Sequence, residues 1–320
     1  MLVAGGQYPV FGANGIIGHY DHYNHVEPEL LMTCRGATCG TINVSLPYSW
    51  INGNAMVIHP INDDVYFDYL KYHLQTLDLS TIITGAAQPQ ITRQSLVNVP
   101  VKLPSIEEQI HIAKELDLLT SIIDKKNAQL RDLDALAQSI FYEMFGDPNA
   151  NSLNWPSSSF KDIFKLKSGD GLKEKDFVTG QFPVYGGNGI SGYHNAFNKE
   201  GKHIIIGRVG AYCGNVRVVE DCFWLTDNAF DAFFDSSVLD YYFASWLLNT
   251  LDLHRFANHA AQPVISNSGL KDLLIILPPI EIQRHFSERV LAILQQKSSI
   301  SNSIIDVERL LSERMDAYFS

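Results

Sequence analysis

The chain has 320 residues, 46% of them apolar, so it holds enough material for two domains with a substantial core in each. Its formal net charge of −11 argues against a protein that coats nucleic acid nonspecifically. The N-terminus has no basic stretch followed by an apolar run, and no window is apolar over the length of a membrane span. We therefore expect a globular protein of the cytoplasm without a membrane partner.

Residues 1–104 predict a first mixed domain. Short apolar runs alternate with glycine, asparagine and proline turn signals, which is typical of short strands. One stretch from Asp68 has the apolar spacing of a helix, so the domain is predicted to be α+β.

Residues 105–146 predict a long helix. Ser105 and Glu108 form a capping-box pattern, and neither glycine nor proline follows until Gly146. Apolar residues then recur on alternating steps of four and three, which is a heptad seam with a lysine in one apolar place. The residues that we expect to face a partner helix are Leu116, Leu119, Ile123, Lys126, Leu130 and Leu133.

Residues 147–278 predict a second mixed domain, and residues 279–320 predict a second long helix of about 40 residues and about 60 Å. Its seam consists of Val290, Ile293, Lys297, Ile300, Ile304 and Val307. One helix cannot bury a narrow seam alone, so the two helices are expected to pair, antiparallel because a whole domain lies between them. The seam lysines either fix the register or extend to solvent from its edge.

An internal repeat relates the two halves. GQYPVFGANGIIG from Gly6 matches GQFPVYGGNGISG from Gly180, a separation of 174 residues. Three further pairs follow in the same order: RGATCG from Arg35 with RVGAYCG from Arg208, AAQPQI from Ala86 with AAQPVI from Ala260, and LPSIEEQ from Leu103 with LPPIEIQ from Leu277. We therefore predict two tandem mixed α/β domains, separated and followed by long helices that form an antiparallel coiled coil, in a dumbbell with pseudo-twofold symmetry.

These four motifs, in this order and in both halves, resemble the specificity subunits of type I restriction-modification systems, and the resemblance covers almost the whole chain. It implies that the mixed domains are target recognition domains, each reading one half of a bipartite site in double-stranded DNA. It implies that the helices are conserved spacers that dock two methyltransferase subunits and, through them, restriction subunits. It also implies no catalysis and no cofactor in this chain, whose sequence lacks a P-loop and an amino-methyltransferase motif.

The two halves differ ahead of the repeat. The segment WPSSSFKDIFKLKSGDGLKEKDFVTG leads into Gly180 from Trp155, whereas only residues 1–5 precede Gly6. We expect the first domain to lack an early helix or strand, which would leave an exposed sheet edge, altered recognition or a place for a complementing segment. The alternative function is therefore a shortened subunit that acts mainly as a coiled-coil scaffold for methyltransferases, or that reads one half-site.

Basic residues are the first group of candidate DNA contacts. The second lead has a local positive excess, typical either of phosphate contacts or of a solvated face. The lysines concerned are Lys165, Lys167, Lys173 and Lys175. Arg35 and Arg208 stand before glycine-rich turns, where arginine either reads guanine or forms a structural ion pair.

Amide and aromatic residues form the second group. Asn14 and Asn188 lie in glycine-rich segments, which favours a turn with positive φ over a base contact. Gln88 and Gln262 suit adenine, although the proline after each also indicates an extended loop. For Tyr212, core packing is preferred over DNA contact. No metal site is expected from His19, His22 and His25, because the second half has Tyr193, Ala196 and Lys199 at these positions and the three histidines lie outside any helix pattern.

Overall fold

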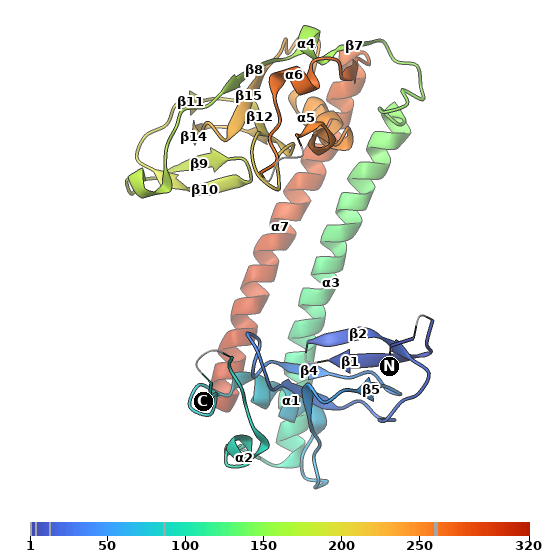
Figure 1. Cartoon of the computed structure of the whole chain (residues 1–320), viewed down its shortest axis with the longest axis vertical. Helices are drawn as coiled ribbons and strands as arrows, with labels where there is room; N and C mark the ends of the chain where they lie inside the picture. Colours follow the sequence, from blue (N-terminus) through green and yellow to red (C-terminus); the bar gives the residue numbers. More distant parts are fainter. Residues whose placement is uncertain (1, 4, 13, 86–87, 259–261) are drawn as a thin grey trace. The chain divides into compact units, whose positions relative to one another are not determined.

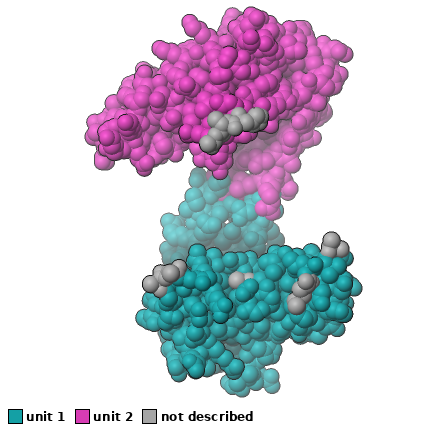
Figure 2. Space-filling view, in the orientation of Figure 1, with its two compact units in different colours: residues 1–128, 301–320 teal, residues 129–300 magenta. Residues whose placement is uncertain are grey.

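The structure is a computed structural model that describes residues 2–3, 5–12, 14–85, 88–258 and 262–320. The alanines of the two Ala-Ala-Gln-Pro segments lie outside these residues. The chain forms two compact units: unit 1 comprises residues 1–128 and 301–320, and unit 2 comprises residues 129–300 (Figure 2). Each unit combines one mixed α/β part with portions of both long helices, so the division falls within the helices and not at their ends.

Unit 1 contains short strands followed by helices (Figure 1). Its elements are β1 (Tyr8–Gly12), β2 (Gly15–Tyr20), β3 (Leu30–Thr33), β4 (Ile42–Val44), β5 (Trp50–Ile51), β6 (Ala55–Ile58), α1 (Phe67–Thr76), α2 (Arg93–Leu96) and the first part of α3 (Ile106–Phe145). Its described strands form two sheets, with orders β2-β1-β5 and β4-β3-β6. α1 covers one side of the second sheet, where Leu70 and Leu74 pack with Leu30 and Met32.

Unit 2 is larger and repeats this plan. Its elements are β7 (Ser157–Ser159), α4 (Phe160–Ile163), β8 (Lys165–Ser168), the 3-10 turn η1 (Glu174–Asp176), β9 (Phe182–Gly186), β10 (Gly189–His194), β11 (Lys199–Glu200), β12 (His203–Gly207), β13 (Val216–Val219), β14 (Cys222–Leu225), β15 (Ala229–Phe233), α5 (Tyr241–Thr250), η2 (Leu253–Phe256), α6 (Asn267–Leu270), β16 (Leu274–Ile276) and the first part of α7 (Ile280–Phe319). Its sheets have the orders β10-β9-β14-β11, β13-β12-β15-β8 and β16-β7.

The strand β12 shows why the sequence gives a sheet buried on both faces. Successive side chains of a strand point to opposite faces, and a sheet covered on both sides has a continuous apolar run. Ile204 and Ile206 belong to the main core with Phe243 of α5, whereas Ile205 packs with Phe223 in a separate cluster. The run His-Ile-Ile-Ile-Gly therefore separates two apolar layers.

The repeat is preserved in the strand register. Val10 pairs with Trp50 between the parallel strands β1 and β5, and Val184 pairs with Trp224 between β9 and β14, each shifted by the same 174 positions. β3 between β4 and β6 corresponds to β12 between β13 and β15. The predicted duplication and the α+β class are thereby confirmed.

The long helices pair antiparallel within each unit. In unit 1, the Glu115 carboxylate accepts a hydrogen bond from Tyr318 (2.6 Å) and forms an ion pair with Arg314 (3.1 Å). In unit 2, Lys297 forms an ion pair with Asp134, on the same helix pair. Later residues of α3 therefore meet earlier residues of α7, which confirms the antiparallel coiled coil.

The heptad residues lie on the inward side of both helices. Five of them are buried: Leu116, Leu119, Val290, Ile293 and Ile304. The other seven are half-buried: Ile123, Lys126, Leu130, Leu133, Lys297, Ile300 and Val307. A pair of helices covers a seam from one direction only, so burial is most complete where a mixed α/β part also packs against the pair, as at Leu116 and Val290. Lys297 reaches Asp134, as expected for a lysine that extends to the edge of the seam.

A buried glutamine joins each long helix to the mixed α/β part of its unit. In unit 1, Gln109 accepts a hydrogen bond from the Tyr66 N–H (2.8 Å) and donates to the carbonyls of Asp64 (2.8 Å) and Pro104 (2.9 Å). The matching residue of unit 2, Gln283, makes the same three kinds of bond. This is the glutamine of the Leu-Pro-x-Ile-Glu-x-Gln motif, and both copies are fully buried.

Candidate DNA interface

Two loops carrying sequence-predicted residues are joined in the same way in both units. The Gly36 N–H donates to the Pro89 carbonyl (2.9 Å), and the Gly210 N–H donates to the Pro263 carbonyl (3.0 Å). Gly36 and Gly210 have φ of +89° and +94°, a conformation that favours glycine. The turn after each motif arginine and the segment after each motif glutamine therefore lie side by side.

A third loop, the tip of a hairpin, lies against the same turn. In unit 2 the approach is close, because a Cβ added at Gly207 would lie 2.3 Å from the Gly187 carbonyl oxygen. In unit 1 the Asn14 side-chain oxygen accepts hydrogen bonds from the hydroxyls of Thr38 (2.6 Å) and Thr33 (3.3 Å). Each mixed α/β part thus presents three adjoining loops, which we call the three-loop surface: the hairpin tip, the glycine-rich turn and the Gln-Pro segment.

The asparagines of the hairpin tips are in turns, but the prediction of positive φ at Asn188 is wrong. Among the described residues the positive φ at the two tips belongs to Gly15 (+114°) and Gly189 (+111°), which follow the asparagines. Glycine adopts this region without a Cβ clash, so the turn places it there. The exposed Asn188 is instead held through its carbonyl, which accepts a hydrogen bond from Arg217 (3.0 Å).

A cleft of about 880 Å³ opens beside the hairpin tip of unit 2. Its lining includes Lys173 and Asn188, but also the carboxylates of Glu174, Asp176 and Asp227. Carboxylates repel phosphate and can accept hydrogen bonds from the amino group of cytosine. Next to the hairpin tip, burial raises the pKa of Tyr185 above its ordinary value. The cleft therefore suits a base edge better than a DNA backbone.

The predicted lysines fall in two places. Lys165 and Lys167 are exposed on β8 and, being two residues apart in a strand, point to the same side. Lys173 precedes η1 and Lys175 lies within it, next to the cleft. The lysines of β8 thus offer charge along a strand, whereas the other two accompany the acidic cleft. That these four contact DNA stays a prediction.

Arg208 is engaged within the protein. Its guanidinium donates to the Ser168 hydroxyl (3.2 Å) and the Asp227 carbonyl (3.4 Å) and lies 5.4 Å from the centre of the Phe230 ring. Its Nε is buried, with no hydrogen-bond partner within the described residues. These contacts join the end of β8 to the turn at the cleft. Arg208 thus has a structural role, but its partners are a hydroxyl and a carbonyl and not the carboxylate of an ion pair.

The remaining candidates are at the surface. Tyr212 is 56% exposed, so the preference for core packing is wrong: the turn directs the neighbouring Cys213 inward and the tyrosine outward. Gln262 is exposed beside it in unit 2. In unit 1, Arg35 and Gln88 are exposed in the corresponding loops. Base contact by these residues remains a prediction.

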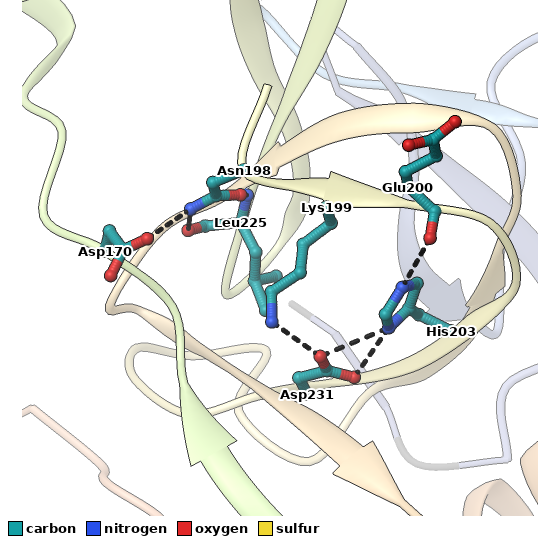
Figure 3. Close-up of polar contacts among 7 residues, drawn as sticks. All are labelled: Asp170, Asn198, Lys199, Glu200, His203, Leu225 and Asp231. Carbon is teal, nitrogen blue, oxygen red and sulfur yellow. Dashed lines mark hydrogen bonds and ion pairs between the residues drawn. The ribbon is translucent and has the colours of Figure 1, made fainter. Parts of the chain in front are cut away.

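Two polar clusters were missed by sequence reasoning (Figure 3). Asn198 donates to the Leu225 carbonyl (3.0 Å) and Asp170 (2.8 Å) and accepts from the Leu225 N–H (2.7 Å). The buried Asp231 of β15 receives Lys199 (2.7 Å) and His203 (3.0 Å). The signal for the second cluster was a carboxylate inside an apolar strand. A buried charge requires such partners.

The described residues contain no group of three or more His, Cys, Asp or Glu side chains placed to hold a metal ion. None of the helices in the described part of the chain is both long and apolar enough to cross a membrane.

Several known proteins are similar to this chain in sequence or in fold. The chain is similar to the EcoprrI type I restriction enzyme specificity subunit of Escherichia coli, with 32% identity over 162 residues, which cover 47% of this chain and 38% of that subunit. It therefore spans well under two thirds of that relative. It is also similar to the MjaIX specificity subunit of Methanocaldococcus jannaschii, with 24% identity over 290 residues, 78% of this chain and 67% of that one.

The fold is similar to a crystal structure of a type I restriction-modification system S subunit from M. genitalium, with a TM-score of 0.69 and 17% identity over 98% of this chain and 89% of that one. A family model for the type I restriction modification DNA specificity domain matches residues 2–132 and 153–309. The repeat, the paired helices and this match lead to one conclusion: the chain belongs to the type I restriction-modification DNA specificity family.

Proposed function

We propose that this chain reads a bipartite site in double-stranded DNA, one half-site for each recognition part, and performs no chemistry itself. The observation that carries the proposal is the three-loop surface, in which the same backbone hydrogen bond joins the glycine-rich turn to the Gln-Pro segment in both units while the side chains differ. Thr38 of unit 1 corresponds to Tyr212 of unit 2, and Asn43 corresponds to Arg217. A shared scaffold with different contact residues is what two unlike half-sites require.

Charge supports specific binding over nonspecific binding. A protein with a net charge of −11 gains little from general attraction to phosphate, so its affinity must come from local contacts. Lys165 and Lys167 supply local positive charge on β8, and the cleft next to it supplies acceptors for base amino groups. We assign the first to the DNA backbone and the second to base edges.

We also propose that methyltransferase subunits, two per chain, dock on the long helices, and that restriction subunits join through them. The helices expose apolar side chains outside the seam, including Leu118 (61%) and Ile305 (61%) in unit 1 and Leu136 (48%) and Leu294 (42%) in unit 2. Exposed leucines and isoleucines on a helix that already has a helical partner favour a further protein contact.

A second candidate function has a specific observation in its favour. β6 of unit 1 pairs only with β3 among the described strands, whereas its counterpart β15 pairs with both β12 and β8. A recognition part with an open sheet edge is expected to be more mobile. The chain would then read only the half-site of unit 2, or hold methyltransferases as a scaffold.

Methylome sequencing separates these functions. The chain is expressed together with its methyltransferase subunit in cells without other methylation of that type, and methylated motifs are mapped. A motif with two specified parts separated by an unspecified gap is expected. A single specified part would support the one-half-site alternative, and a stable complex without any methylated motif would contradict DNA reading.

A further inference from the structure

The two hairpin tips are held in different ways, beginning with their asparagines. In unit 1 the Asn14 side-chain oxygen accepts hydrogen bonds from the hydroxyls of Thr38 (2.6 Å) and Thr33 (3.3 Å), so the amide itself fastens the tip to the glycine-rich turn. Shifted by 174 positions, these threonines correspond to Tyr212 and Gly207 of unit 2. Glycine has no hydroxyl, and the side chain of Tyr212 is 56% exposed. Unit 2 therefore does not repeat the two hydroxyl bonds of unit 1.

The main chain of the glycine-rich turn supports this correspondence. The Gly40 N–H donates to the Thr33 carbonyl (2.8 Å), and the Gly214 N–H donates to the Gly207 carbonyl (2.7 Å). The donor and the acceptor are each shifted by the same 174 positions. Because the backbone of the turn is alike in both units, the difference between the tips comes from their side chains.

An arginine holds the tip of unit 2. Arg217 of β13 donates from its guanidinium to the Asn188 carbonyl (3.0 Å). The guanidinium also lies against Gly189, because a Cβ added there would be 2.2 Å from Nη1. β13 is the edge strand of one sheet, whereas the hairpin strands β9 and β10 belong to another. The tip of unit 2 is therefore fastened through its main chain, from the neighbouring sheet.

This arrangement leaves the Asn188 side chain uncommitted. The residue is exposed and lines the cleft of about 880 Å³, and its amide makes no hydrogen bond to any residue that the structure describes. An amide offers a donor beside an acceptor, which matches the major-groove edge of adenine. The carboxylates of Glu174, Asp176 and Asp227 in the same cleft repel phosphate, so the cleft favours a base edge as the partner of this amide.

We propose that Asn188 is a specificity-determining residue of unit 2, whose amide pairs with an adenine edge in the half-site, and that Arg217 positions it. The inference rests on the proposed reading of DNA and adds that the matching asparagines have different roles. Asn14 is a structural residue of its hairpin tip, because its amide oxygen already holds two hydroxyls. Arg217 fixes the main chain of the other tip and thereby the direction of the Asn188 amide.

Methylome sequencing of cells that express the full chain with its methyltransferase subunit tests the base contact. Asn188→Ala should reduce discrimination at one base pair of one half-site by about tenfold. Asn188→Asp has the same shape but only accepts hydrogen bonds, so it should shift the preference at that base pair from adenine to cytosine. The other half-site is the internal control and should keep its sequence. Relaxation of no single base pair, or a loss spread evenly over all sequences, would overturn the proposal.

Variants of Arg217 test the positioning role. Arg217→Asn introduces the residue of unit 1 and should relax the same base pair as Asn188→Ala, with faster hydrogen exchange at residues 186–191. Arg217→Lys keeps a donor and should retain more of the preference. The losses of the Asn188→Ala and Arg217→Asn variants should not add in the double variant, and additive losses would show that the arginine contacts DNA directly. Lys271→Asn removes a charge at an exposed position of unit 2 and should leave the preference unchanged.

The same substitution in unit 1 is the matched control. Asn14→Asp keeps the oxygen that accepts both hydroxyls, so it should leave every base preference unchanged, in contrast to Asn188→Asp. A switch of base preference by Asn14→Asp would contradict the different roles of the two asparagines. Failure of the proposed function gives another result, since the unaltered chain would then yield no motif with two specified parts. An intact two-part motif that Asn188→Ala leaves unchanged would refute this inference alone.

Discussion

The mixed α/β parts of units 1 and 2 share their turns and strand registers but differ in how their sheets end. In unit 2 the sheet continues from β15 to β8, and Phe160 and Phe164 close the core beneath it. In unit 1 the corresponding sheet ends at β6 beside an apolar groove. The backbone hydrogen bond that joins the glycine-rich turn to the Gln-Pro segment is nevertheless the same in both. The loops proposed to face DNA are thus organised independently of the segment that completes the core behind them.

The largest effect is expected when unit 2 is made to resemble unit 1. Phe160→Ala removes a fully buried ring and should destabilise unit 2 by about 3–5 kcal/mol, from lost transfer free energy and the cavity left behind. Urea unfolding followed by tryptophan fluorescence measures this. Val97→Ala, at a 73% exposed position in the groove of unit 1, is the control and should change stability by less than about 0.5 kcal/mol. Equal losses of stability in the two variants would mean that the buried Phe160 ring contributes no more to unit 2 than an exposed side chain does to unit 1.

Substitution of the buried glutamine, Gln109 in unit 1 or Gln283 in unit 2, should lower the free energy of unfolding by a similar amount in both units. Gln109→Leu and Gln283→Leu each leave one N–H and two carbonyls without partners, so each should cost about 3 kcal/mol or more. The free energy of unfolding is measured for each variant beside Gln138→Leu and Gln295→Leu, which alter exposed glutamines of the same helices. A strong effect in one unit only would show that the joints are not equivalent.

The lysines of β8 have no counterpart in the described part of unit 1, so they should affect DNA binding through unit 2. The double variant Lys165→Ser and Lys167→Ser should weaken DNA binding on the order of tenfold at low salt. It should also reduce the slope of log affinity against log salt by about one for each phosphate that is no longer neutralised. The exposed Lys125→Ser on α3 is the control. An unchanged slope would place these lysines away from the DNA.

The smallest expected effect is a pH dependence confined to unit 1. Burial, and to a lesser extent Lys102, lowers the pKa of His73 below the ordinary value of 6.5, and its neutral Nε2 accepts the Lys102 N–H (3.2 Å). Below about pH 6.5 the unfolded chain takes up the proton first, so stability falls as the pH decreases towards the folded pKa. Leu247 is the corresponding residue of unit 2. His73→Leu should flatten this decrease in urea unfolding between pH 7.5 and 5, and an unchanged decrease would assign it to other groups.

Sequence patterns predicted the features of the fold that depend on residues close together in the chain. The seam residues and the capping pattern at Ser105 indicated α3, because helix period and punctuation are read from neighbouring residues. The internal repeat indicated that the chain contains two mixed α/β parts of the same plan. In contrast, Lys199, His203 and Asp231 come from three separate strands or their ends, so their cluster follows only from the sheet register.

The interface residues were harder to assign, because exposure and pairing are tertiary properties. Arg208 was predicted as a base reader or an ion-pair partner; it donates to Ser168 and a carbonyl and not to a carboxylate, and base contact by it stays a prediction. Arg217, which clamps the hairpin tip of unit 2, carried no motif at all and was missed. A difference between matched positions, arginine against Asn43, was the signal that could have found it.

The glutamine joints have a consequence for which side chains of the mixed α/β parts are free to change. Gln109 and Gln283 bind only main-chain groups of the recognition parts, and the main chain is the same whatever side chains it carries. These bonds do not depend on the side chains at the main-chain groups that they join, whereas the packing of α1 on α3 still depends on side chains such as Tyr72 and Asp117. If the mixed parts read DNA as proposed, these glutamine bonds would be kept when one part is exchanged for another at the Leu-Pro-x-Ile-Glu-x-Gln segment.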